Sequence, residues 1–137
     1  MWILFALLSA VFAALTTIFA KIGLNNINSN LAVAIRTVIV LVMAWAIVFF
    51  TGKHNEIAAI SQKNILFLIL SGLATGLSWI FYYRALQIGD ASKVIPIDKL
   101  SIVFGMVMAF VILKEAVTLK TIIGGALITI GAFVLIL

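Results

Sequence analysis

Residues 65–86 read ILFLILSGLATGLSWIFYYRAL, and this run decides which solvent the chain needs. Its 22 residues contain one charged side chain, Arg84. A membrane helix needs about 20 mainly apolar residues to cross a hydrocarbon core of roughly 30 Å. The strands of a membrane barrel alternate in polarity over about ten residues, and this run does not. The stretch therefore predicts a membrane-spanning α-helix over Ile65–Leu86.

Four more apolar runs of similar length lie on either side of this one. They are Trp2–Leu24, Leu31–Phe50, Val94–Leu113 and Leu119–Leu137. We expect the first to remain in the protein, because no basic residue precedes it and it exceeds the roughly 7–15 apolar residues of a signal peptide. The segments between the runs are too short to fold as a second domain. The sequence thus predicts an all-α integral membrane protein, with five transmembrane helices in one domain over residues 1–137.

The composition excludes the soluble classes of protein. Of the 137 residues, 66% are hydrophobic and 9% are charged, whereas a soluble domain is about half apolar and a quarter charged. The nine Lys and Arg residues are scattered between the apolar runs, without the basic stripe of a nucleic-acid-binding protein. With no Cys, four carboxylates and His54 as the one histidine, the chain can barely assemble a metal site or a catalytic triad. We therefore expect no enzyme, no cofactor or metal, and no nucleic-acid partner.

Positive charge is almost evenly divided between the two sides of the membrane. Five crossings place the termini on opposite sides, and the side richer in Lys and Arg usually stays cytoplasmic. The N-terminal side carries four such residues: Lys53, Lys63, Lys114 and Lys120. The other side carries five: Lys21, Arg36, Arg84, Lys93 and Lys99. Two interpretations stay open. Either one or two residues dominate insertion, or the chain inserts in both orientations.

Three of the charged residues inside the apolar runs, Arg36, Asp98 and Lys99, are candidates for a polar site. Arg36 and Lys99 are each the sixth residue of a predicted helix, about 8 Å from its start, and topology starts both helices from the same side. Each either reaches the headgroups by snorkelling or lines a polar site. Asp98 is too short to snorkel well, and adjacent helical residues point in different directions, so we do not expect it to pair with Lys99. We expect Arg36 or Lys21 as its partner, and half of a binding site at this corner.

Small residues occupy one face of several predicted helices. Gly72 and Gly76 form a GxxxG motif in the third helix, continued by Trp79 and Tyr83. In lipid, such faces let helices approach closely. The fifth helix carries Gly124, Gly125 and Gly131. We expect all five glycines at packing positions, with packing inside the chain as the alternative to contact with another chain. A neighbouring face of the third helix carries Ser71, Thr75, Ser78 and Tyr82, which predicts the wall of a water- or ligand-filled cavity.

The junction between the third and fourth helices reads YYRALQIGDASKVIPI over Tyr82–Ile97. It resembles the same junction in EamA-type repeats of the drug/metabolite transporter superfamily. Glu115 and the run IGGALITIG over Ile123–Gly131 resemble that family's acidic residue after helix four and its glycine-rich last helix. The resemblance covers all five helices and implies a multi-spanning transporter of small solutes. Most members carry two such repeats, inverted relative to each other, whereas this chain has one.

The four-helix small multidrug resistance proteins of the same superfamily couple protons to cationic drugs through a membrane-buried Glu. Because Trp2–Ala20 contains no carboxylate, we do not expect antiport of that type. Inverted repeats expose one midplane site alternately to each side, and two copies of this chain in opposite orientations would recreate the pair. The hypothesis is an antiparallel homodimer in a prokaryotic cytoplasmic membrane, moving a small polar or amphipathic metabolite. The alternative is a non-transporting subunit that pairs with another membrane protein.

The expected cavity residues are Arg36, Trp79, Tyr82, Tyr83, Asp98 and Lys99. The aromatic rings would stack on apolar or cationic parts of the solute. Arg36 and Lys99 would face a carboxylate or phosphate. Asp98 would bind an amine of the solute, bind a coupling proton, or compensate the charge of its basic neighbours.

Overall fold

The computed structural model describes all 137 residues, and it contains helices and no strands. Five helical segments are long and apolar enough to cross a membrane: Trp2–Gly23, Ser29–Phe50, Gln62–Ile88, Ala91–Ile112 and Leu119–Ile136. The prediction of an all-α membrane protein with five spans is confirmed, with the ends of the spans shifted by up to three residues.

Apolar side chains of these spans remain mainly exposed. Leu86 is the one large side chain that is fully buried, whereas Phe81 on the same helix is 71% exposed. A protein that folds in water buries most of its large apolar side chains. A bilayer, or another apolar protein surface, is therefore needed to cover this chain.

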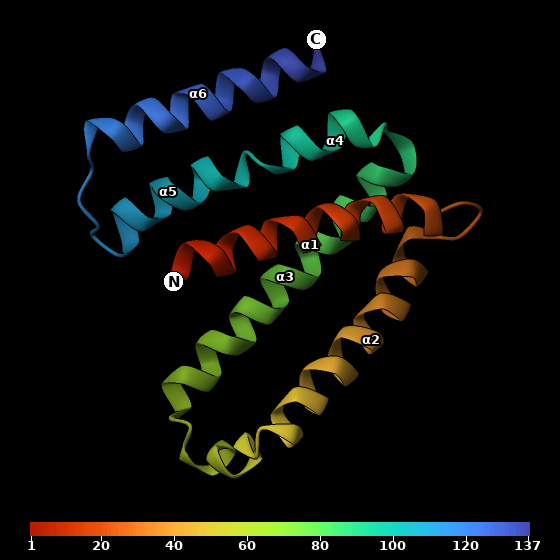
Figure 1. Ribbon diagram of the computed structural model, residues 1–137, viewed down its shortest axis with the longest axis vertical. Helices are drawn as coiled ribbons and strands as arrows, with labels where there is room; N and C mark the ends of the chain where they lie inside the picture. The colour runs from red at the N-terminus through yellow and green to blue at the C-terminus, as the bar shows by residue number, and fades with distance from the viewer. The chain divides into compact units, whose positions relative to one another are not determined.

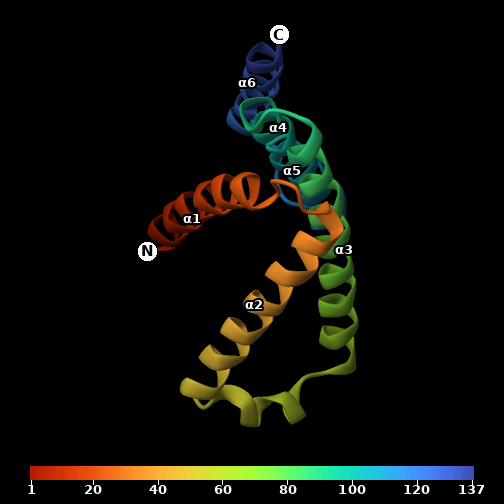
Figure 2. The same cartoon turned by 90° about the vertical axis from the view of Figure 1, so that its right-hand side faces the viewer.

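Two compact units make up the chain (Figures 1 and 2). The α2–α3 unit comprises Phe19–Gln87. Its elements are the last turn of α1 (Trp2–Gly23), α2 (Ser29–Phe50), the 3₁₀-helix η1 (Lys53–Ala59) and α3 (Gln62–Ile88). The α4–α6 unit comprises Met1–Ile18 and Ile88–Leu137. Its elements are the rest of α1, α4 (Ala91–Asp98), α5 (Ser101–Ile112) and α6 (Leu119–Ile136).

In the α2–α3 unit, two spans run in opposite directions and are joined by η1. Figures 1 and 2 both show α2 and α3 close together where α2 begins and wider apart toward η1. The side chain of Asn28 caps α2 by accepting from the N–H groups of Asn30 (2.9 Å) and Leu31 (3.4 Å), which satisfies donors that the first turn leaves unpaired. Gly52 adopts the left-handed conformation (φ 69°) that leads into η1. The sequence analysis did not predict η1.

The fourth predicted helix, Val94–Leu113, differs from the structure in two respects. The first difference is its start: α4 begins at Ala91, and Asp90 occupies the N-cap position without a side-chain capping bond. Ser92 lies inside this helix and does not cap it. Since the helix begins earlier than predicted, Pro96 falls in its interior instead of its first turn.

The second difference is a break in this span. α4 ends at Asp98, and α5 follows after a two-residue turn. Pro96 does not by itself explain this break, because the hydrogen bond that its missing N–H removes is to the carbonyl four residues before it. In the turn, the N–H of Leu100 donates to the carbonyl of Ile97 at 3.0 Å. This bond spans three residues, as in a 3₁₀ turn. The two short helices together still form one apolar span, Ala91–Ile112.

In the α4–α6 unit, α6 packs against both α4 and α5. Gly125 of α6 lies at the contact with α5, where a Cβ added to it would lie 3.1 Å from Cε of Met106. A groove of about 280 Å³ follows this contact and is also lined by Phe110 and Thr129. The hydroxyl of Thr129 donates to the carbonyl of Gly125 at 2.9 Å. The absence of a side chain at Gly125 therefore allows α5 and α6 to pack closely.

We expect Gly125→Leu to lower stability more than Gly124→Leu. A leucine at Gly125 must displace Met106, and overpacking of this kind typically costs about 1–3 kcal/mol. A Cβ on Gly124 meets nothing within 4 Å, so the neighbouring substitution is a matched control. The measurement is the thermal unfolding midpoint of each purified variant in detergent. Equal midpoints for the two variants would contradict close packing at Gly125.

Candidate functional site

Three of the expected cavity residues lie together in the α2–α3 unit. The guanidinium carbon of Arg36, on α2, lies 4.1 Å from the ring centroid of Trp79 and 5.6 Å from that of Tyr83, both on α3. Trp79 and Tyr83 are four residues apart and so share one face of their helix. The contact joins two different membrane spans and pairs a cation with two aromatic rings.

This cluster lies well inside the span. Because α2 begins at Ser29, Arg36 is its eighth residue, about 10 Å along the helix axis and deeper than the sequence predicted. Tyr83 is 4% exposed, while Arg36 and Trp79 are half-buried. Cation–π contacts contribute about 0.5–2 kcal/mol, whereas a charge at the centre of a span costs about 2.5–3.5 kcal/mol on insertion scales. The rings offset only part of the cost of placing Arg36 here.

The guanidinium group also lacks an acidic partner in its own unit. Glu56 is the one carboxylate within Phe19–Gln87, and it pairs with Lys53 at 2.5 Å. Atom Nη1 of Arg36 is buried and has no hydrogen-bond partner. Leaving a buried donor unsatisfied costs about 1–3 kcal/mol, and more when the group is charged. The cluster thus presents a positive hydrogen-bond donor without an acceptor.

The neighbouring face of α3 fits the predicted polar wall only in part. The Tyr82 ring lies edge-on to that of Tyr83, with centroids 6.5 Å apart, and extends the aromatic cluster. The hydroxyl of Thr75 donates to the carbonyl of Ser71 at 2.9 Å. Since its own helix satisfies this donor, the face does not require a water-filled cavity beside it.

Polar contacts tie the loop between α1 and α2 to the end of α3. The ammonium group of Lys21 donates to the carbonyl of Leu86 at 2.5 Å, and the amide of Gln87 donates to the carbonyl of Ile27 at 2.8 Å. A hollow of about 660 Å³ lies beside these contacts and is also lined by Asn26. Gln87 was not predicted from the sequence, and Lys21 was expected only as a partner for Asp98. Cations near a helix end often bond its last carbonyls, but the carbonyl here belongs to a different helix.

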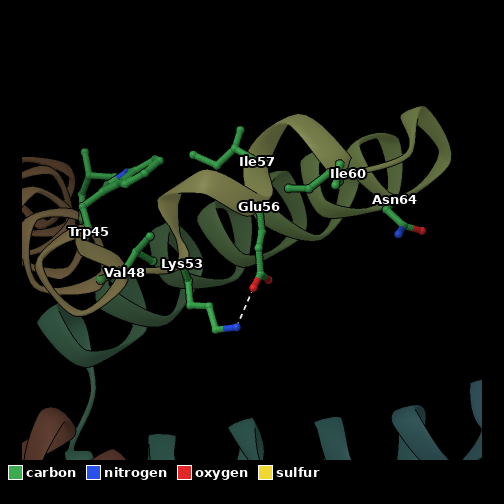
Figure 3. A pocket seen from close by; sticks show the side chains of 10 residues that line it. Trp45, Val48, Lys53, Glu56, Ile57, Ile60 and Asn64 are labelled. Atoms are coloured by element: carbon green, nitrogen blue, oxygen red, sulfur yellow. Dashed lines mark hydrogen bonds and ion pairs between the residues drawn. The ribbon is translucent and has the colours of Figure 1, made fainter. Parts of the chain in front are cut away.

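A second groove lies where α2 and α3 separate, next to η1 (Figure 3). Its volume is about 660 Å³, and its labelled lining residues are Trp45, Val48, Lys53, Glu56, Ile57, Ile60 and Asn64. The Lys53–Glu56 ion pair lies at one side of the groove. The exposed His54 has its ring centroid 5.5 Å from that of Phe49. Aromatic and charged side chains gathered at the end of a span are typical of the membrane–water interface.

Asp98 and Lys99 belong to the α4–α6 unit, and they form an ion pair. Lys99 Nζ lies 3.4 Å from Asp98 Oδ2. The expectation that these neighbours do not pair is wrong. It assumed a continuous helix, whereas α4 ends at Asp98 and Lys99 lies in the turn that follows. That these two residues share one cavity with Arg36 remains a prediction.

The predicted packing glycines differ in their surroundings. A Cβ added to Gly125 meets Met106, whereas one added to Gly72, Gly76, Gly124 or Gly131 meets nothing within 4 Å. Side chains of the same unit therefore do not require glycine at these four positions.

The chemistry of the site points to binding. No three His, Asp or Glu side chains gather in a way that could hold a metal ion. The groups that the structure brings together are a guanidinium and the rings of Trp79, Tyr82 and Tyr83. Such groups recognise an organic solute by charge and by apolar contact.

Comparisons with known proteins agree with this interpretation. The chain matches the EamA-like transporter family over residues 1–137. It is 49% identical over 134 residues to an uncharacterized transporter in the cobO 3′ region of a Sinorhizobium species, covering 98% of this chain and 95% of the relative. It is 29% identical over 133 residues to an uncharacterized protein of Methanocaldococcus jannaschii, covering 97% and 94% of the two chains. No solved structure matches. The resemblance seen at the Tyr82–Ile97 junction is confirmed, and the chain belongs to the EamA-like transporter family.

Proposed function

We propose that the protein is a secondary transporter that moves a small polar or amphipathic solute across a prokaryotic cytoplasmic membrane by alternating access. The observation that carries this proposal is the cluster of Arg36, Trp79 and Tyr83 inside two spans of a transporter-family chain. The guanidinium group offers a charged contact, and the rings offer an apolar one. A solute with one polar end and one apolar part matches both.

Alternating access further leads us to propose an antiparallel homodimer. Transporters commonly obtain their two equivalent states from inverted repeats around a midplane site. The matches to the two relatives cover 95% and 94% of the relatives' own lengths, so these proteins too are about one five-helix repeat long. Two copies inserted in opposite orientations would supply the inverted pair. The near-equal numbers of Lys and Arg on the two sides permit this arrangement.

In this dimer, each protomer contributes its aromatic cluster to a shared cavity near the midplane. We propose that Tyr82 completes the aromatic wall and that Asp98 and Lys99 line the same cavity. The ion pair between Asp98 and Lys99 at the break in the span would keep both charges compensated until the solute arrives. Transporter sites commonly lie at such discontinuous helices.

Purification and reconstitution test the proposal. The protein, purified from cells that express it alone, should cross-link as a homodimer, and metabolites that raise its thermal unfolding midpoint are candidate solutes, because ligands that bind only the folded state stabilise it. Those solutes should then enter liposomes that contain the protein and should not enter empty ones. A second polypeptide that co-purifies in equal amount, with no solute movement, would instead favour the non-transporting subunit.

We expect the chain to insert in both orientations. The two sides differ by one positive charge, so the positive-inside rule gives little preference for either orientation. Fusions at Leu137 to a reporter active in the cytoplasm and to one active outside should both give signal. One added Lys on either side should shift the balance between the two signals. A single strong orientation that the added Lys leaves unchanged would contradict the antiparallel dimer but not the family assignment.

A further inference from the structure

The unsatisfied donor of Arg36 indicates the chemical class of the solute. Nη1 is buried and has no acceptor, although the aromatic rings lie 4.1 and 5.6 Å from the guanidinium carbon. We infer that the transported solute carries an oxyanion, either a carboxylate or a phosphate, that accepts hydrogen bonds from the Arg36 guanidinium group. This inference rests on the proposed transport function and narrows its substrate class to anions.

The rings of Trp79 and Tyr83 hold the Arg36 guanidinium group in place without accepting hydrogen bonds from it. Cation–π attraction acts through the ring quadrupole and supplies no lone pair along an N–H bond. A guanidinium group presents five N–H donors in a planar fork that fits a carboxylate or a phosphate with two parallel hydrogen bonds. Trp79 and Tyr83 therefore act as positioning residues. They hold the Arg36 guanidinium group in one orientation and leave an N–H group free to donate to the solute.

The charge of the surrounding unit favours the same class of ligand. Phe19–Gln87 contains five Lys and Arg residues and one carboxylate, Glu56, which is already paired. Arg84, the other arginine of the unit, is exposed and donates to the Gln87 side chain at 3.0 Å. A cationic solute would meet an uncompensated positive charge at Arg36, whereas an oxyanion would neutralise it. Low dielectric in the span strengthens both effects.

Aromatic probes that differ only in charge test this inference on the purified protein in detergent. Benzoate and phenyl phosphate should raise the thermal unfolding midpoint, whereas the neutral analogue benzamide should not. Arg36→Gln should weaken benzoate binding about 10- to 100-fold, since a hydrogen bond to a charged group is worth about 1.5–3 kcal/mol. Arg36→Lys, which keeps the charge and loses the fork, should fall in between. Arg84→Gln is the matched control and should bind benzoate as the parent protein does.

Fluorescence gives a readout that does not depend on variant stability. With Trp2→Phe and Trp45→Phe in place, Trp79 is the one remaining tryptophan, next to Arg36. Benzoate should change its emission with a saturable dependence, and Arg36→Gln should abolish that change. Saturable binding of equal strength to benzamide, or benzoate binding that persists in Arg36→Gln, would overturn the inference.

The anion can come from a soluble metabolite or from a lipid headgroup, and bilayers of defined composition separate the two. If the site holds a headgroup, nanodiscs of phosphatidylglycerol, but not of phosphatidylcholine, should alter Trp79 emission through Arg36, and soluble benzoate should compete poorly. Either source supports the oxyanion site. Liposome uptake distinguishes this inference from the proposed function. Benzoate that binds through Arg36 without crossing would count against transport, and uptake equal in Arg36→Gln would count against the anion site.

Discussion

Asp98→Asn is expected to destabilise the folded protein, and Lys99→Met added to it should recover most of that loss. Asp98 and Lys99 lie 3.4 Å apart at the turn between α4 and α5, with side chains 33% and 50% exposed. In a membrane, removal of one partner leaves the other charge within an apolar span, at a cost of up to about 2.5–3.5 kcal/mol. Removal of both relieves that cost. The measurement is a double-mutant cycle on free energies of unfolding, obtained from unfolding in increasing dodecyl sulfate.

A second cycle identifies the partner of Asp98. The sequence predicts Arg36 or Lys21 as this partner, and Arg36 lies in the α2–α3 unit and has no acidic partner there. If Asp98 pairs with Lys99 alone, Asp98→Asn and Arg36→Gln should have additive effects. If Arg36→Gln recovers the stability that Asp98→Asn removes, and Lys99→Met does not, then Arg36 and not Lys99 is the partner of Asp98. Lys21→Met combined with Asp98→Asn tests the other predicted partner in the same way, although the ammonium group of Lys21 donates to the Leu86 carbonyl.

The five spans were predictable because membrane insertion imposes a simple requirement of length and apolar content. The predicted Leu31–Phe50 and the observed α2 differ only at the start, where the Asn28 cap lets the helix begin at Ser29. Polar residues in the first turns of α2 and α3 do not contribute to an apolar run, so hydropathy alone underestimates both helices. The shorter predicted spans have this physical cause.

The break near Lys99 and the helix η1 could not be predicted in the same way. Apolar content is continuous through Val94–Leu113 apart from two charges, so it gives no sign of where hydrogen bonds are interrupted. The interior position of Pro96 was hidden because the predicted start of the helix came three residues too late. Likewise, η1 is a short segment that follows the left-handed Gly52, and it lies between two apolar runs, where hydropathy predicts no element.

Part of the candidate site could be predicted, because the spacing of residues in the sequence determines which side chains share one face of a helix. Trp79 and Tyr83 share a face at a spacing of four, and Arg36 stood out as a charge inside a span. Sequence spacing does not say which face of α3 meets α2, and the structure provides that contact. The contacts of Lys21 and Gln87 were hidden because they join polar ends of separate helices to backbone carbonyls, which carry no sequence signal.

The surroundings of Gly72 and Gly76 on α3 indicate that these glycines serve dimerisation rather than folding of the α2–α3 unit. A Cβ on Gly72 or Gly76 meets nothing within 4 Å, so glycine there does not serve contacts within the α2–α3 unit. Glycine also costs about 0.8–1 kcal/mol in a helix relative to alanine. Small residues at this spacing let two membrane helices approach closely. We therefore propose that this face of α3 contacts the second copy in the dimer.

Gly76→Leu should accordingly weaken the dimer while leaving the protomer folded. Overpacking at a close helix contact typically costs about 1–3 kcal/mol, and 1.4 kcal/mol is about tenfold in the dissociation constant. The dissociation constant of the dimer, obtained by energy transfer between labelled protomers diluted in detergent, should rise by about that factor, and by more in Gly72→Leu/Gly76→Leu. Helical content should stay unchanged. Ala74→Leu, on the opposite and exposed face of α3, is the matched control and should dimerise normally. If Gly76→Leu dimerises as the control does, this face of α3 meets lipid, and the shared cavity must be built by other helices.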